Sequence, residues 1–128
     1  MKRETVWTAG APAAIGPYSQ GVRAGGFLFC SGQLPLDPST GKMVDGGIEA
    51  QTERVLSNLE AVLNAGGATL RSVVKTTVYL VDMGEFPAMN AVYAKFFPED
   101  PPARATVQIG KLAAGARVEV EAIAIEST

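Results

Sequence analysis

The segment from Pro101 to Glu126, PPARATVQIGKLAAGARVEVEAIAIE, places three charged side chains where two strands are predicted. Arg104 stands at the mouth of the first predicted strand, and Glu119 and Glu121 lie inside the second. A guanidinium is a planar, permanently charged fork that binds a carboxylate through two parallel hydrogen bonds. A carboxylate in a partly buried pocket orients a water molecule and takes its proton. Surface or interface ion pairs use the same residue types, and residue type alone favours them.

Strand alternation sorts the two closing strands, predicted at Arg104–Ile109 and Arg117–Glu126 and joined as a hairpin by GKLAAGA. In the second strand, Val118, Val120, Ala122 and Ala124 share one face, and Glu119, Glu121, Ile123 and Ile125 share the other. In the first, Arg104, Thr106 and Gln108 oppose Ala105, Val107 and Ile109. A sheet face that mixes carboxylates with Ile is typical of neither a solvent-exposed surface nor a hydrophobic core. It predicts an oligomer interface with a polar pocket, unless a one-residue slip inverts the faces.

The remaining elements follow from hydrophobic period and from the Gly and Pro residues that interrupt it. The stripe of apolar residues between Ile48 and Ala65 predicts a helix that stops at a Gly pair. A second helix is predicted at Gly84–Phe97, with Pro in its first turn and Pro after its end. Strands are predicted at Lys2–Trp7, Val22–Arg23, Phe27–Ser31 and Ser72–Asp82. This order predicts an α+β fold in which two helices cover one face of a single sheet.

Length and composition narrow the classes of protein. A chain of 128 residues predicts one domain, residues 1–128. One Cys and no His argue against a zinc site, an intrachain disulfide, and Cys–His or Ser–His catalysis. The net charge of −2 argues against a nucleic-acid partner. No apolar run approaches the ~20 residues of a membrane helix. We therefore expect a soluble, cytoplasmic protein with no metal and no cofactor.

Six stretches together carry a family resemblance that covers the chain from about Ala11 to Glu126. They are AIGPYSQG, FCSGQLPLDP, EAQTERVLSNLEAVLNAGGA, VVKTTVYLVD, MNAVYAKFF and PPARATVQIGKLAAGARVEVEAIAIE. In these stretches the chain resembles the Rid/YjgF family, and within it the archetypal reactive intermediate deaminase (RidA) subgroup. The resemblance implies a chorismate-mutase-like fold with a single mixed sheet, and a barrel-like homotrimer with active sites between subunits. It also implies hydrolysis of 2-imino acids, released by pyridoxal-phosphate dehydratases, to 2-keto acids and ammonia.

The resemblance assigns roles to particular residues. Arg104 matches the family arginine that binds the substrate carboxylate, and Glu119 matches the glutamate near the attacking water. Tyr18 matches a loop tyrosine that closes the pocket, and its expected catalytic role is a hydrogen bond to the substrate nitrogen or to the water. Ser31 and Gly32 match positions that offer a hydroxyl and a backbone N–H to the substrate. Residue type alone favours plainer interpretations: interface or surface charges for Arg104 and Glu119, and a packed loop aromatic for Tyr18. Ser31 and Gly32 would then form a simple turn at the end of a strand.

Further positions at the same site are assigned less directly. Asn90 corresponds to a residue that braces the site, although a mid-helix Asn also suits solvent. Thr106 stands where well-known members have Cys, which affects pocket size and polarity or, if a thiol matters, rate. Glu121 is interpreted as an interface or surface charge. Cys30, in an apolar strand, is interpreted as a small core residue with no nucleophilic role.

Two functions of other classes remain open at this point. A trimer that binds keto acids could sense metabolites without turning them over. RNA cleavage or translation inhibition is a label attached to some relatives. The acidic balance and the lack of His weigh against RNA cleavage. Hydrolysis of the product of threonine dehydratase separates an enzyme from a metabolite sensor.

Overall fold

The computed structural model describes residues 2–126, and the long helix predicted from the apolar stripe is present with the predicted bounds as α1 (Ile48–Ala65). Its stripe is fully buried at Val55, Leu56, Leu59, Val62 and Leu63. The helix ends at a Gly pair, and the second of these, Gly67, has a φ of +83°, a conformation that a residue with a Cβ rarely adopts. The periodicity of the sequence therefore determines both the buried face and the end of α1.

The second helix, α2 (Phe86–Phe96), begins two residues later than predicted. A short 3₁₀ turn at Met83–Glu85 precedes it, and Asp82 caps this turn by accepting a 2.8 Å hydrogen bond from the Gly84 N–H. The predicted Pro lies in the first turn of α2, where its missing N–H has no helical partner to lose. The sequence pattern therefore predicts one helix where the structure has a 3₁₀ turn, capped by Asp82, followed by α2.

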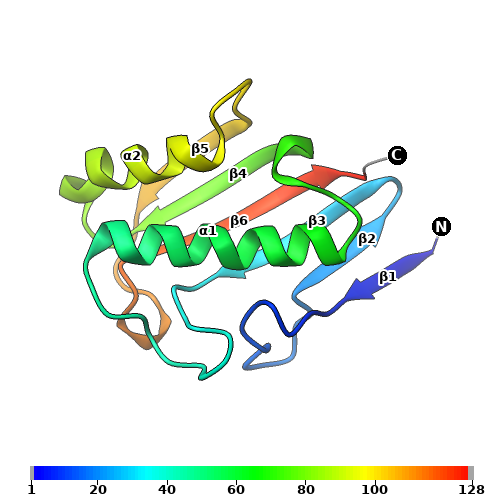
Figure 1. Ribbon diagram of the computed structural model, residues 1–128, viewed down its shortest axis with the longest axis horizontal. Coiled ribbons are helices and arrows are strands. Elements are labelled where there is room, and N and C mark those ends of the chain that lie inside the picture. Colours follow the sequence, from blue (N-terminus) through cyan, green and yellow to red (C-terminus); the bar gives the residue numbers. More distant parts are fainter. Residues whose placement is uncertain (1, 127–128) are drawn as a thin grey trace.

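Six strands form one mixed sheet in the order β1-β2-β3-β6-β4-β5, with both helices on one face (Figure 1). The strands are β1 (Arg3–Val6), β2 (Gly21–Ala24), β3 (Phe27–Gln33), β4 (Val73–Leu80), β5 (Ala103–Gln108) and β6 (Val118–Ile125). All neighbouring pairs are antiparallel except β4 and β5, which are parallel. The turn between β2 and β3 has positive φ at Gly25 and Gly26, as a tight hairpin turn requires. The predicted α+β fold with a single mixed sheet covered on one face is confirmed.

The predicted hairpin of the two closing strands is wrong, because β4 lies between β5 and β6. Parallel strands cannot be joined by a tight turn, so the chain crosses over through α2 between β4 and β5. It then returns to insert β6 between β3 and β4. This order has a direct consequence for the charged residues, since β5 and β6 do not pair with each other and instead flank β4 on its two edges.

The strand registers place Arg104 and Glu119 on opposite faces of the sheet. Arg104 lies beside Thr76, whose buried side chain faces the helices. Glu119 lies beside Tyr79, three residues further along β4, and Tyr79 therefore points to the other face. Within β6 the predicted alternation is confirmed, because Val118 and Val120 are fully buried under the helices.

The sheet face away from the helices, here called the open face, carries large apolar side chains without cover from the described residues. Phe27, Phe29 and Ile125 are 43%, 44% and 45% exposed. Strand pairing sets Phe27 opposite Ile125 and Phe29 opposite Ile123. Contiguous exposed apolar surface of this kind usually marks an interaction site. The homotrimer remains a prediction that this face favours.

No helix within residues 2–126 combines the length and the apolar character needed to cross a membrane. Most of the buried apolar side chains of the described residues form one cluster between the helices and the sheet. The single-domain prediction, which also covers residues 1, 127 and 128 outside the described part, stays a prediction.

Candidate functional site

Four of the predicted site residues gather around the end of β3, and we call them the Glu119 half-site: Tyr18, Ser31, Gly32 and Glu119. The Glu119 carboxylate lies against the backbone of Gly32. A Cβ added at Gly32 would lie 2.7 Å from Cδ of Glu119, closer than real Cβ contacts allow. Glycine at this position therefore lets the carboxylate approach the β3 backbone.

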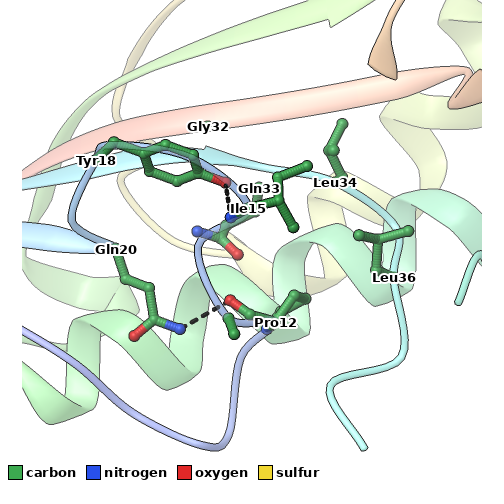
Figure 2. A pocket seen from close by; sticks show the side chains of 9 residues that line it. Pro12, Ile15, Tyr18, Gln20, Gly32, Gln33, Leu34 and Leu36 are labelled. Carbon is green, nitrogen blue, oxygen red and sulfur yellow. Dashed lines mark hydrogen bonds between the residues drawn. The ribbon is translucent and has the colours of Figure 1, made fainter. Parts of the chain in front are cut away.

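The loop that carries Tyr18 packs on the same strand end and lines a small pocket with it (Figure 2). The Tyr18 hydroxyl accepts a 3.3 Å hydrogen bond from the Ile15 N–H, within its own loop. The Ser31 N–H donates to the carbonyl of Gln20 at 2.9 Å, and the Ser31 hydroxyl donates to the carbonyl of Ser19. The pocket is lined by Pro12, Ala13, Ile15, Tyr18, Gln20, Gly32, Gln33, Leu34 and Leu36. Ser31 thus holds the loop and β3 together.

Gln20 fixes the shape of this loop, a role that sequence analysis missed. Its side chain is 3% exposed and accepts a 2.7 Å hydrogen bond from the Thr8 N–H. Its amide nitrogen approaches the carbonyls of Thr8, Ala11 and Pro12 at 3.1, 3.3 and 2.8 Å. Figure 2 shows the contact with Pro12. The only available signal was a polar residue at the start of an apolar strand, which does not distinguish a buried amide from an exposed one.

We expect Gln20→Leu to lower the free energy of unfolding by about 2 kcal/mol, because buried and part-buried backbone groups of Thr8, Ala11 and Pro12 would lose the polar partner that Gln20 provides. The loop from residue 8 to residue 20 should also exchange its amide hydrogens faster. Urea unfolding and hydrogen exchange measure the two effects. Gln108→Leu is the matched control, since Gln108 is exposed and accepts one hydrogen bond from the Met83 N–H. Equal losses in the two variants would contradict the role given to Gln20.

A second group of predicted residues lies on the helix side of the sheet, and we call it the Arg104 half-site. The Arg104 guanidinium carbon lies 4.7 Å from the ring centroid of Tyr93 and 5.5 Å from that of Phe86. Tyr93 is held in turn by a 2.7 Å hydrogen bond between its hydroxyl and that of Thr76. Cation–π contact at these distances favours one placement of the guanidinium. The signal for both rings was their spacing of seven residues on one face of α2.

The Arg104 guanidinium has no carboxylate within salt-bridge distance among residues 2–126. The ion pairs of this part of the chain are Arg23–Glu4 and Arg117–Glu85. Arg104 instead lines a pocket with apolar walls, formed by Asn90, Tyr93, Ala94, Phe97, Pro101, Pro102 and Arg104. A permanently charged fork held by aromatic rings beside a pocket is suited to bind an anionic group.

Asn90 and Thr106 lie on the same side of the sheet as Arg104. Asn90 lines the Arg104 pocket from α2, and Thr106 follows Arg104 by two residues on β5. The Asn90 Oδ1 and Thr106 Oγ1 atoms are buried, and neither has a hydrogen-bond partner in the described part of the chain. Buried polar atoms in native proteins nearly always have a hydrogen-bond partner. We therefore expect both atoms to bond to a group outside these residues.

The two half-sites do not meet within one chain, because they lie on opposite faces of the sheet. The sequence prediction placed Arg104 near Ser31 and Gly32 of its own or of a neighbouring subunit. The strand registers exclude the first option and leave the second as a prediction. Each chain would then contribute one half of two different sites.

Burial and charge raise the pKa of Glu119 above its ordinary value. Burial makes the larger contribution, and the neighbouring carboxylate of Glu121 adds to it. Burial also raises the pKa of the Cys30 thiol to about 12, so that thiol is protonated at neutral pH and is no nucleophile. Among residues 2–126, no three side chains of the metal-binding types come together.

Comparison with known proteins identifies the family. Residues 8–126 match the family model described as Endoribonuclease L-PSP, and the chain belongs to this family, which is also called YjgF/Rid. A RutC family protein of Pyrococcus horikoshii is 50% identical over 122 residues, 95% of this chain and 97% of that protein. A 2-iminobutanoate/2-iminopropanoate deaminase of Mus musculus is 46% identical over 124 residues, 97% of this chain and 92% of that protein.

Solved structures agree with this assignment. A Thermotoga maritima protein with a provisional endoribonuclease name is 48% identical, with a TM-score of 0.95 and full coverage of both chains. E. coli TdcF with bound serine is 38% identical, with a TM-score of 0.92 and coverage of 97% of this chain and 99% of that one. The family thus includes proteins named as deaminases of 2-imino acids and one that binds a small amino acid.

Proposed function

We propose that this protein hydrolyses reactive 2-imino acids, such as 2-iminobutanoate and 2-iminopropanoate, to 2-keto acids and ammonia. The observation that carries the proposal is the Arg104 guanidinium, which is held by two aromatic rings and has no carboxylate partner within residues 2–126. The substrate carboxylate would be that partner, bound in two parallel hydrogen bonds. The name of the mouse relative supports the same substrates.

The site is completed by a second copy of the chain. The Arg104 half-site lies at the β5 edge and the Glu119 half-site on the open face, so each contact joins two different surfaces. Contacts between unlike surfaces close into rings rather than two-fold dimers. A homotrimer with three shared sites fits this requirement, and it covers the exposed Phe27, Phe29 and Ile125 side chains. Each small-molecule substrate would then be held between two chains.

Hydrolysis needs one water molecule and two proton transfers. Arg104 fixes the carboxylate while the water oxygen adds to C2 and the C=N electrons move to nitrogen. Glu119 takes a proton from this water and passes it to the nitrogen, which gives a carbinolamine. The carbinolamine hydroxyl then transfers its proton to the nitrogen as the C–N bond breaks, leaving ammonia and the C2 carbonyl. Tyr18, Ser31, Gly32, Asn90 and Thr106 orient the substrate around these atoms.

A coupled assay tests the activity. Threonine dehydratase releases 2-aminocrotonate, which tautomerises to 2-iminobutanoate, and we expect this protein to form 2-ketobutanoate faster than spontaneous hydrolysis does. Formation at the spontaneous rate would contradict the proposal. It would favour metabolite binding without turnover, which the serine-bound relative also supports. Incubation with single-stranded RNA tests the activity in the family's name, for which this chain has no His to act as acid or base.

Complementation between inactive variants tests whether the site is shared. Arg104→Ala and Glu119→Gln should each be nearly inactive alone. Subunits unfolded together and refolded as a mixture should regain activity, because one interface then joins an intact Arg104 to an intact Glu119. Random equal mixing restores about a quarter of the sites in a ring. Light scattering should give three times the mass of the chain for both variants. A mixture as inactive as its components, at that mass, would contradict a site shared between two chains.

A further inference from the structure

Two residues of the open face that the proposed reaction does not use, Tyr79 and Glu121, are joined by a hydrogen bond beside Glu119. The Tyr79 hydroxyl donates to Oε1 of Glu121 at 2.8 Å. In the β4–β6 register, Tyr79 is opposite Glu119, and Thr77 is opposite Glu121. The Tyr79 side chain therefore reaches diagonally along the ladder from the Glu119 pair to the Glu121 pair.

Few charged groups surround Glu119 on this face. On β6 itself, Glu121 is two residues away and on the same face. On β4, Tyr79 is the direct neighbour, while Lys75 lies opposite Ile123, beyond Glu121. On β3, the contact is the uncharged backbone of Gly32, with the Tyr18 phenol across the adjoining pocket. In the proposed assembly, Arg104 of a second chain faces Glu119 across the substrate.

We propose that Tyr79 holds Glu121 as a fixed negative charge on the same face as Glu119, and that this arrangement makes Glu119 the carboxylate that exchanges protons during turnover. The part of this inference that concerns turnover rests on the proposed function. The effect of Glu121 on Glu119 does not, because it depends only on the geometry of one chain. Glu121 and Tyr79 are positioning residues in this scheme.

The physical basis is that two neighbouring carboxylates in different surroundings separate in their proton affinity. Burial and the charge of Glu121 raise the pKa of Glu119. The hydrogen bond to Glu121 is the largest cause of the raised pKa of Tyr79, which keeps its proton and remains a donor at neutral pH. The hydrogen bond from Tyr79 thus fixes the position of the Glu121 carboxylate, while burial disfavours the ionised form of Glu119.

A carboxyl ¹³C NMR titration of the whole protein, labelled at Glu, tests the coupling without any substrate. Glu119 is assigned from the resonance lost in Glu119→Gln. In Glu121→Gln, we expect the titration midpoint of Glu119 to move to lower pH, since a like charge is gone. In Tyr79→Phe, we expect the titration midpoint of Glu119 to move to lower pH by a smaller amount, since Glu121 is no longer held beside it. Glu53→Gln, an exposed change on α1, is the matched control and should leave the midpoint of Glu119 in place.

The rate profile provides the second measurement. A general base loses activity as the pH falls through its pKa, so the acid limb of the kcat profile should move to lower pH in Glu121→Gln. The plateau should stay within about tenfold of the parent, because Glu119 is still present. A Glu119 midpoint that is unchanged in Glu121→Gln overturns the inference. If that variant fails to fold, an unchanged Glu119 midpoint in Tyr79→Phe overturns it instead. Normal coupling in a protein that hydrolyses no imino acid overturns the proposed function alone.

Discussion

Arg104→Lys is expected to lower kcat/KM for 2-iminobutanoate by about 100-fold while keeping the positive charge on β5. One ammonium cannot reproduce the two parallel hydrogen bonds that fix the plane of the substrate carboxylate. It also loses the flat face that stacks on Tyr93 and Phe86. Misplacing the imine carbon by about 1 Å costs on the order of 100-fold in rate. Steady-state kinetics in the coupled dehydratase assay measure the loss.

Arg104→Ala should lose more activity, because the substrate carboxylate would enter a partly desolvated pocket without a partner. Arg71→Lys is the matched control, since it makes the same chemical change at an exposed position outside the candidate site. Light scattering must show that each variant still assembles, because loss of charge at an interface can also separate subunits. Assembled Arg104 variants that hydrolyse the substrate at the parent rate would reduce Arg104 to an interface ion pair.

Glu119→Gln is expected to bind a 2-keto acid as the parent does and to lower kcat by about 10²- to 10⁴-fold, the usual contribution of a positioned acid or base. The amide holds a water molecule but cannot take its proton. It has nearly the size of the carboxylate, so its fit against Gly32 is preserved. Calorimetry with 2-ketobutanoate measures binding, and the coupled assay measures turnover.

The control for this variant is Glu53→Gln, which removes one carboxylate from the exposed face of α1. It should leave both binding and turnover unchanged. A Glu119→Gln protein with the parent kcat would exclude proton transfer by this residue. A protein that loses keto-acid binding and turnover together would instead make Glu119 a binding group.

Elements whose periodicity is strong could be predicted from the sequence, and so could the faces they bury. The bounds of α1 are as predicted, and the alternation of β6 separates buried Val118 and Val120 from Glu119 and Glu121. These patterns are local, because each depends on one element packing against one core. The same locality explains why the predicted ends of α2 and β4 differ from those observed by one or two residues.

Strand order could not be read from periodicity, because alternation gives the faces of a strand but not its neighbours. The closing strands are adjacent in sequence, yet β4 separates them in the sheet. This is why Arg104 and Glu119, fifteen residues apart in the numbering, lie on opposite faces. The contacts of Gln20 and Tyr93 were missed for a related reason, since hydrogen bonds between residues 8 to 17 positions apart leave no periodic pattern in the sequence. The residue types at the candidate site could be predicted from the sequence. Their division into two half-sites could be seen only from the strand order and register of the sheet.

Because Cys30 is buried, the rate at which its thiol is alkylated reports the separation of β3 from its neighbouring strands. Cys30 is the one cysteine of the chain, and it lies on β3 opposite Ala122 of β6. With a thiol pKa of about 12, only about one molecule in 10⁵ carries the thiolate at neutral pH while the ladder is closed. An alkylating reagent therefore modifies the chain mainly during moments when β3 has opened. Mass spectrometry of the labelled fraction against time would report how often the strands that carry Gly32 and Glu119 come apart, and how far a bound keto acid slows that opening.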